Sequence, residues 1–155
     1  MTRVRLRPMR QDEYDAWLAV SVGRYGREKV LTGVVAAGDA DEWAAGQHAR
    51  LLPDGLRTAG HHLLVAEDDE RVGMLWLLVP EGERPRAFVY DLEVEPARRG
   101  RGLGREVMRA AEQYALEHGA ATIALHVFGH NHVARSLYDG LGYRVTDLTM
   151  AKPLG

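Results

Sequence analysis

The 155-residue sequence contains no cysteine. This absence excludes disulfide bonds, cysteine-ligated zinc and a thiol nucleophile. A group-transfer reaction catalysed by this chain would therefore have to proceed without a thioester on the enzyme.

The sequence also lacks a large net charge and a long apolar run. A net charge of −2 gives the whole molecule no reason to bind nucleic acid or an anionic membrane, so a basic site would have to be local. The longest apolar run, Met74 to Val79, is far shorter than the ~20 residues of a membrane span. No apolar run follows the N-terminus as it would in a signal peptide. We therefore expect a cytoplasmic protein with no nucleic-acid partner and no membrane partner.

Length and composition fit one globular domain over residues 1–155. The chain has the commonest size of a single domain, and its apolar fraction of 46% and charged fraction of 27% are ordinary.

Hydropathy patterns in the first half predict a strand over 3–7, one or two helices over 11–36, a helix to about Leu52, and strands over 62–67 and 72–79. Asp39 or Asp41 is placed to cap the helix that ends near Leu52.

The second half predicts a strand–helix–strand unit and a short tail of two elements. The patterns give a strand over 87–94, a helix over 101–118, a strand over 122–128, a short helix over 131–141 and a final strand over 143–150. Strict alternation over 87–94 places Phe88, Tyr90, Leu92 and Val94 on one face and Ala87, Val89, Asp91 and Glu93 on the other. A strand–helix–strand unit joins parallel neighbours, whereas the earlier strands read as hairpins. The fold class is therefore α/β (an α+β mixed sheet), with helices on both faces.

The loop between the strand over 87–94 and the long helix carries three glycines and four arginines. Gly100, Gly102 and Gly104 allow the backbone to approach an anion closely. The first turn of the helix adds unpaired N–H groups and the positive end of a dipole. Together they predict an anion site. The four arginines, of which we expect only some to contact phosphate, are Arg98, Arg99, Arg101 and Arg105.

Other phosphate motifs fit this loop poorly. A Gly-x-Gly-x-x-Gly fingerprint fails because Arg105 stands where its last glycine would be. A Walker A loop fails because no Gly-Lys-Ser/Thr is present. A nucleic-acid patch would spread its arginines over a face with exposed aromatic residues. The remaining alternative is a solvated basic loop whose glycines only serve the turn.

The sequence resembles the GCN5-related N-acetyltransferase (GNAT) superfamily in three motifs. Arg99 to Gly104 matches the family signature Arg/Gln-x-x-Gly-x-Gly/Ala. Leu92 to Pro96 is similar to the central strand and its Val-x-Pro exit, and Asn131 to Tyr143 is similar to the Asn-x-x-Ala-x-x-Leu-Tyr-x-x-x-Gly-Phe motif. The resemblance covers about Leu63 to Pro153 and implies a GNAT-like acyl-CoA N-acyltransferase fold with acetyl-CoA as co-substrate.

The resemblance also implies roles for particular residues. The pyrophosphate of CoA would be held by Arg99, Gly100, Arg101, Gly102, Leu103, Gly104 and Arg105. The pantetheine arm would pair with Leu92, Glu93 and Val94 like an added strand, where the two parallel strands separate, and a backbone N–H would polarise the thioester carbonyl. Asn131 would hydrogen-bond the arm or the helix entry, and Tyr138 would bind beside the departing thiolate and protonate it.

The general base has three candidates. Glu93 lies on the central strand beside the expected thioester and could act directly or through water. His126 lies twelve residues before Tyr138, where GNAT ribosomal-protein alanine acetyltransferases carry an acidic base, and a histidine has a suitable pKa. Asp91 is the third candidate, and many family members use water instead.

The sequence leaves the acceptor and the assembly open. We expect a small-molecule or peptide amine as acceptor and a possible homodimer, as is common in the resembled family. No metal is expected, because no cysteine or carboxylate completes a ligand set with His126, His130 and His132. The alternatives to an enzyme are an acyl-CoA-binding module without turnover and a nucleic-acid-binding domain that uses the arginine turn.

Overall fold

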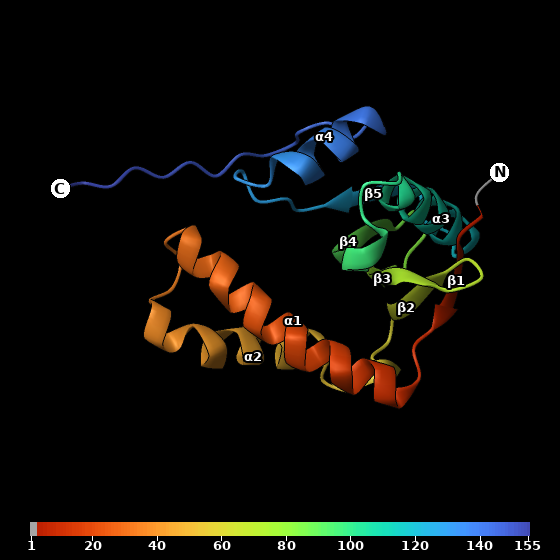
Figure 1. Cartoon of the computed structure of the whole chain (residues 1–155), viewed down its shortest axis with the longest axis horizontal. Coiled ribbons are helices and arrows are strands. Elements are labelled where there is room, and N and C mark those ends of the chain that lie inside the picture. Colours follow the sequence, from red (N-terminus) through yellow and green to blue (C-terminus); the bar gives the residue numbers. More distant parts are fainter. Residues whose placement is uncertain (1–2) are drawn as a thin grey trace. The chain divides into compact units, whose positions relative to one another are not determined.

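The computed structural model describes residues 3–155, which fall into two compact units (Figure 1). One unit ends at Leu125, and the other runs from His126 to Gly155. The prediction that residues 1–155 form one domain stays a prediction. Across residues 3–155, no helix combines the length and the hydropathy needed to span a membrane.

The first unit is built on a five-stranded mixed sheet. Its strands are β1 (Arg5–Pro8), β2 (His61–Glu67), β3 (Arg71–Leu78), β4 (Arg86–Val94) and β5 (Thr122–Leu125). They lie side by side in the order of their numbers. The pairs from β1 to β4 are antiparallel, and β4 pairs with β5 in parallel. The predicted mixed sheet is confirmed.

Helices cover both faces of this sheet, as predicted. The helices of the first unit are α1 (Gln11–Leu31), η1 (Ala37–Asp39), α2 (Ala40–Leu51), η2 (Gly55–Arg57), η3 (Pro96–Arg98) and α3 (Leu103–Glu117). Trp17 of α1 packs with Leu63 and Val65 of β2 in one core cluster. Val107 of α3 packs with Ala66 in the other. Because neighbouring residues of a strand point to opposite faces, β2 supplies apolar side chains to both clusters.

Helices α1 and α2 lie against each other at a glycine. A Cβ atom at Gly26 would come 2.8 Å from the carbonyl oxygen of Ala40, so only glycine allows this approach. Beside this contact, Tyr25 of α1 stacks on Trp43 of α2 with ring centroids 5.5 Å apart. The two helices therefore form one layer on their face of the sheet.

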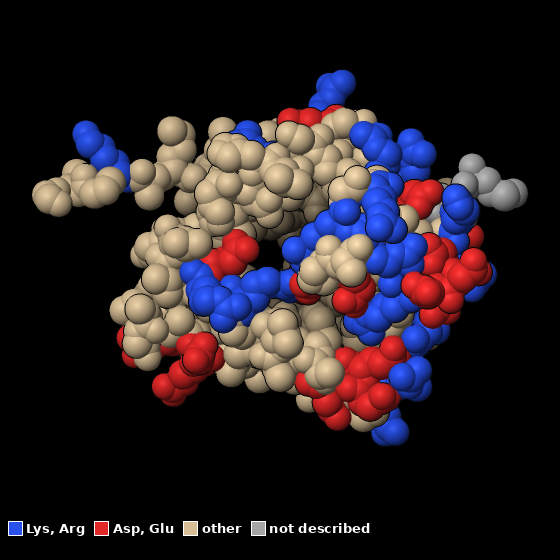
Figure 2. All heavy atoms as spheres, in the orientation of Figure 1, with Lys and Arg blue, Asp and Glu red and all other residues tan. Residues whose placement is uncertain are grey.

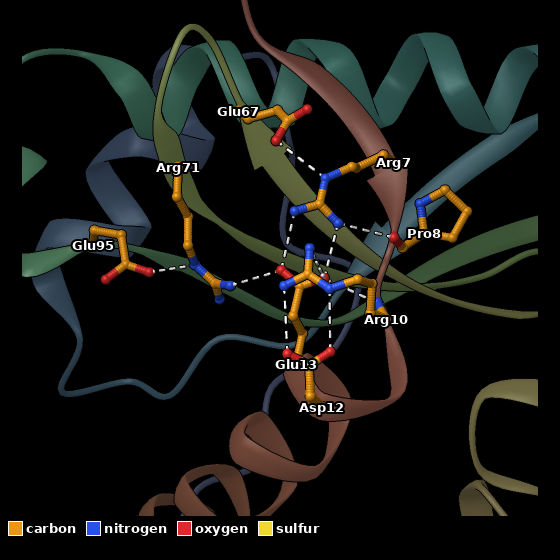
Figure 3. A network of polar contacts seen from close by, with 8 residues as sticks. All are labelled: Arg7, Pro8, Arg10, Asp12, Glu13, Glu67, Arg71 and Glu95. Atoms are coloured by element: carbon orange, nitrogen blue, oxygen red, sulfur yellow. Dashed lines mark hydrogen bonds and ion pairs between the residues drawn. The ribbon is translucent and has the colours of Figure 1, made fainter.

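An ionic network joins the start of α1 to the sheet (Figure 3). Glu13 accepts hydrogen bonds from the Arg7 guanidinium at 2.8 and 3.0 Å, and Arg7 also reaches Glu67 at 3.1 Å. Arg71 lies 3.5 Å from Glu13 and 2.6 Å from Glu95. The hydrogen bond from Arg7 lowers the pKa of Glu13 to about 2. Charged side chains of both signs are interleaved over this end of the unit (Figure 2).

The pairing of β3 with β4 contains a bulge. Trp76 lies opposite Asp91 while the next residue, Leu77, lies opposite Val89, so Tyr90 is an extra residue on β4. A bulge breaks the alternation of a strand, because one additional residue reverses the faces of all residues after it.

The prediction of one apolar face along the whole of β4 is therefore wrong. Leu92 and Val94 pack on the α3 cluster, but Tyr90 contacts Trp76, which belongs to the α1 cluster. Asp91 and Glu93 also face α1, where both meet an arginine. The bulge thus gathers an aromatic ring and two carboxylates on the α1 side of the sheet.

One predicted strand boundary and one predicted strand are also wrong. β5 ends at Leu125, so residues 126–128 lie outside it. Residues 143–150 have no strand pairing, and Val145, Leu148 and Met150 are 61%, 74% and 88% exposed. Alternation alone does not make a strand, because the backbone also needs a pairing partner. The second unit instead contains one short helix, α4 (His132–Gly140), among the residues described.

Candidate functional site

The loop that enters α3 has the open glycine backbone expected of an anion site. Gly100 and Gly102 have φ angles of 79° and 75°, a left-handed conformation that favours glycine. A Cβ atom at either position would meet no atom within 4 Å, so this side of the backbone is unobstructed. The backbone at Gly100 and Gly102 is therefore accessible, which is what close binding of a phosphate requires.

The N-terminus of α3 offers donors to this open side. Gly102 is the N-cap residue of this 15-residue helix, and no side chain caps the first turn. The N–H groups of a first turn have no partner within the helix, and they lie at the positive end of its dipole. Glu106 is the acidic residue in this turn, and the arginines of the loop outnumber it.

The four arginines of the loop have different environments. Arg98 is bound to Asp68 by contacts of 2.6 and 2.8 Å, which fix the loop to the β2–β3 hairpin and hold the pKa of Asp68 well below its usual range. Arg99 donates from Nε to the carbonyl oxygen of Val94 at 3.0 Å. Arg101 is exposed, and Arg105 is half-buried. Arg98 is therefore structural, while the other three are candidates for phosphate contacts.

The second half of β4 continues beyond its parallel partner. The pairing of β4 with β5 ends at Val89 and Leu125, and β4 extends to Val94. The N–H of Glu95 donates to Val72 of β3 at 2.8 Å. Because donors alternate between the two edges of a strand, the N–H groups of Leu92 and Val94 point away from β3. This edge is suited to pairing with an extended, amide-containing arm.

Arg24 of α1 binds both carboxylates of β4, a contact that the sequence did not predict. Its guanidinium donates to Glu93 Oε2 at 2.6 Å and to Asp91 Oδ2. Trp17 Nε1 donates to the same oxygen of Asp91 at 3.3 Å. Arg99 Nη2 approaches Glu93 Oε1 at 3.5 Å from the loop. Burial raises the pKa of Asp91, because desolvation outweighs the attraction of Arg24.

One signal for Arg24 was present in the sequence. Trp17, Ser21 and Arg24 stand at positions i, i+4 and i+7 of the first predicted helix, which places the arginine on the stripe that faces the sheet. An arginine there needs a buried anionic partner. The identity of that partner is a long-range property, because Asp91 and Glu93 lie 67 and 69 residues away along the chain.

Aromatic rings form a wall beside the carboxylates. Tyr90 stacks on Trp76 with centroids 4.7 Å apart, and the His61 ring lies 5.7 Å from Tyr90. Trp76 Nε1 donates to His61 Nδ1 at 3.0 Å, so this nitrogen is an acceptor. Burial lowers the pKa of His61 and favours the same neutral form. We define Tyr90, Trp76 and His61 as the aromatic wall.

The second unit holds the remaining predicted site residues. Asn131 Oδ1 accepts from the N–H of Ala134 at 3.1 Å, so this side chain caps α4. Tyr138 lies on α4, half-buried, with its ring centroid 5.8 Å from that of Tyr143. His126 is exposed and follows β5, whereas it was predicted to lie within that strand. Asn131 thus caps the short helix that carries Tyr138, while Leu92, Glu93, Val94 and Arg99 are brought together in the first unit.

Residues 3–155 contain no group of three or more His, Asp or Glu side chains arranged to hold a metal ion. The described site is therefore made of a phosphate-type loop, an open strand edge, two carboxylates with an arginine, and aromatic rings.

The acetyltransferase (GNAT) family profile matches residues 25–143 of this chain. The chain belongs to this family. It is similar to the uncharacterized N-acetyltransferase YycN of Bacillus subtilis strain 168, with 36% identity over 154 residues that cover 97% of this chain and 99% of the relative. The crystal structure of YycN from Bacillus subtilis superimposes with a TM-score of 0.93, covering 97% of this chain and 98% of that one. A mycothiol acetyltransferase of Renibacterium salmoninarum is 30% identical over 147 residues, which cover 92% of this chain but 41% of the relative.

Proposed function

We propose that this protein transfers an acetyl group from acetyl-CoA to a primary amine, by direct attack within a ternary complex. The observation that carries the proposal is the open glycine backbone at the N-terminus of α3, formed by Gly100 and Gly102. Membership of the acetyltransferase family supports it. With no cysteine in the chain, no acyl-cysteine intermediate is available.

In this proposal the first unit binds the donor. The backbone from Arg99 to Arg105 holds the pyrophosphate, assisted by the side chains of Arg99, Arg101 and Arg105. The N–H groups of Leu92 and Val94 pair with the pantetheine arm, and an N–H of this strand polarises the thioester carbonyl. Acetyl-CoA, when bound, supplies the activated acetyl group.

Two proton transfers complete the proposed reaction. An amine with a pKa near ~10 must lose a proton before it can attack, and Glu93 is the first candidate to accept it. His126 is the second candidate. Tyr138 protonates the leaving thiolate, since a phenol retains its proton near neutral pH. Asn131, which caps α4, supports the helix that carries Tyr138.

The acceptor is proposed only as an amine on a small molecule or a peptide. The mycothiol acetyltransferases support acetyl transfer, but this chain matches less than half of such a relative. The second candidate function is an acyl-CoA-binding module without turnover. The half-buried Tyr138 on a capped helix favours the enzyme over this module.

The test is an acceptor screen with acetyl-CoA that measures released thiol. Because the chain has no cysteine, every thiol detected comes from CoA. We expect acetyl-CoA to raise the melting temperature and at least one class of primary amine to release CoA. Stabilisation without turnover on any amine would identify the binding module. Absence of stabilisation, with salt-sensitive binding to oligonucleotides, would overturn the proposal.

A further inference from the structure

Arg24 is a cation in the middle of an otherwise anionic and aromatic face. We infer that Arg24 is a specificity-determining residue, which restricts acceptors to amines that carry one positive charge on an apolar or aromatic body. The inference rests on the proposed acetyl transfer and names the substrate class of that same site. Everything it uses lies in the first unit, on α1, β2, β3, β4 and the loop before α3.

The first step is the charge of the face. Asp91 and Glu93 supply two carboxylates, and Arg24 binds both of them. With both carboxylates ionised, the three groups carry one net negative charge. Protonation of Asp91 would bring that sum to zero. In neither state can the three groups neutralise two added cations.

The second step is the direction from which a ligand can reach these groups. Asp91 is the more buried carboxylate, with its side chain 16% exposed against 31% for Glu93. Glu93 also lies on the half of β4 that extends beyond β5. An ammonium group can therefore approach Glu93, and Arg24 stands 2.6 Å from the same carboxylate. A second ammonium on the same ligand would be held close to a charge of its own sign.

Other cations border the same face. Arg99 approaches Glu93 from the phosphate loop, where the proposed function assigns it to pyrophosphate. Farther along α1, the Lys29 ammonium lies 5.5 Å from the centroid of the Tyr25 ring. Each of these two cations repels the positive charges of a ligand that carries several of them.

The third step is the aromatic wall, which suits the body of the acceptor. Tyr90 is 36% exposed and stacks on Trp76. His61 joins it as a ring whose Nδ1 accepts a hydrogen bond. An apolar or flat group packed on these rings would bury apolar surface. A monoamine with such a body brings one positive charge to the carboxylates and packs its apolar part on the aromatic wall.

The experiment compares matched amines on the full-length protein. The first pair is pentylamine and 1,5-diaminopentane, which differ in one ammonium group. Phenethylamine, compared with pentylamine, tests the aromatic body. We expect kcat/KM for pentylamine to exceed that for 1,5-diaminopentane by about tenfold or more, and phenethylamine to be a still better substrate. This comparison needs no variant.

Three variants then test Arg24 itself. Arg24→Gln removes the cation, and we expect the ratio of kcat/KM for monoamine over diamine to fall about tenfold, mainly through a gain on the diamine. Arg24→Lys keeps the charge and should keep most of the ratio. Arg27→Gln is the matched control, since Arg27 is an exposed residue three positions further along α1. It should leave the ratio within about twofold.

Calorimetric titration of the same amines, in the presence of CoA, separates this inference from the proposed function. Selective binding of monoamines without turnover would reject acetyl transfer and keep the role of Arg24. Turnover with equal use of both amines, or an unchanged ratio in Arg24→Gln, would overturn the role of Arg24 and keep acetyl transfer. Binding of neither amine, with no turnover, would overturn both.

Discussion

A Cβ atom at Gly73 would lie 1.9 Å from the carbonyl oxygen of Glu93. Gly73 stands on β3 directly opposite Val94, so this tight contact between the two strands lies at the residues proposed to bind the donor. The absence of a side chain at Gly73 therefore determines where the backbone of Glu93 lies. The same contact therefore positions both the open edge of β4 and Glu93.

Gly73→Ala should destabilise the fold. No flexible side chain can move aside, because the obstructing atom belongs to the backbone of β4. We expect a loss of roughly 1–3 kcal/mol in the free energy of unfolding, measured by urea denaturation. Gly46→Ala is the matched control: Gly46 lies inside α2 with no atom within 4 Å of an added Cβ. It should gain roughly 0.5–1 kcal/mol. Equal effects of both substitutions would refute this account of Gly73.

Gly102→Leu should weaken acetyl-CoA binding by tenfold or more, because a side chain would cover the amides at the start of α3. Gly119→Leu is its control at the other end of the same helix. Gly119 also has a positive φ, 91°, and open space around it. Both variants should lose stability similarly, roughly 1–2 kcal/mol from the left-handed backbone. Calorimetry with acetyl-CoA should separate them, and unchanged affinity in Gly102→Leu would remove the donor site from this loop.

Tyr138→Phe should lower kcat about 10²-fold or more while leaving the dissociation constant of acetyl-CoA nearly unchanged. The reason is that only the departing thiolate needs the phenolic proton. Tyr143→Phe, which alters the neighbouring ring of the same unit, should have little effect on kcat. A parallel loss of kcat and affinity in Tyr138→Phe would assign this tyrosine to packing.

Substitution and pH profiles can separate the first two base candidates, Glu93 and His126. We expect Glu93→Gln to lower kcat/KM by about 10²-fold, because Glu93 lies beside the proposed thioester and the acceptor amine. His126→Gln should change kcat/KM much less and leave the pH profile intact. If His126 is the base instead, its variant will lose most of kcat/KM and alter the pH profile, and Glu93→Gln will leave both intact.

Glu13 should contribute stability at neutral pH and lose it in acid. Its pKa is lowered from 4.5 to about 2 by Arg7, so the folded protein favours the ionised form. This contribution is complete above pH 4.5 and disappears as the pH falls toward 2. Glu13→Gln should therefore cost roughly 1–3 kcal/mol at pH 7. In urea denaturation, the difference in the free energy of unfolding between wild type and variant should disappear over this acidic range. A difference that stays constant with pH would contradict the assigned role of Glu13.

Local patterns were sufficient for the regular elements of the first unit. The helix predicted over 101–118 is α3, Leu103–Glu117, because its apolar stripe and the glycine after it are properties of neighbouring residues. The two hairpin strands before it are β2 and β3. The glycine loop could also be predicted from the sequence, since glycine permits the positive φ angles found at Gly100 and Gly102.

Features that depend on contacts between distant parts of the chain could not be predicted from the sequence. The apolar alternation continues through Tyr90, so nothing in the local pattern marks the bulge that reverses the faces of β4. The ion pairs of Arg24 depend on that bulge, because it turns Asp91 and Glu93 toward α1. Residues 143–150 alternate as well but have no strand pairing. Pairing partners, unlike periodicity, are set by the tertiary fold.

The distribution of tryptophan gives the protein an internal optical probe. The three tryptophans of the sequence are Trp17, Trp43 and Trp76. Trp17 and Trp76 meet edge to face at 5.4 Å, and Trp43 stacks on α1 through Tyr25. All three therefore report on the side of the sheet covered by α1 and α2, and none lies on α3. Changes in intrinsic fluorescence should follow an amine arriving at the carboxylates and remain nearly silent to a phosphate arriving at Gly102, so one emission spectrum can separate the two binding events without any label.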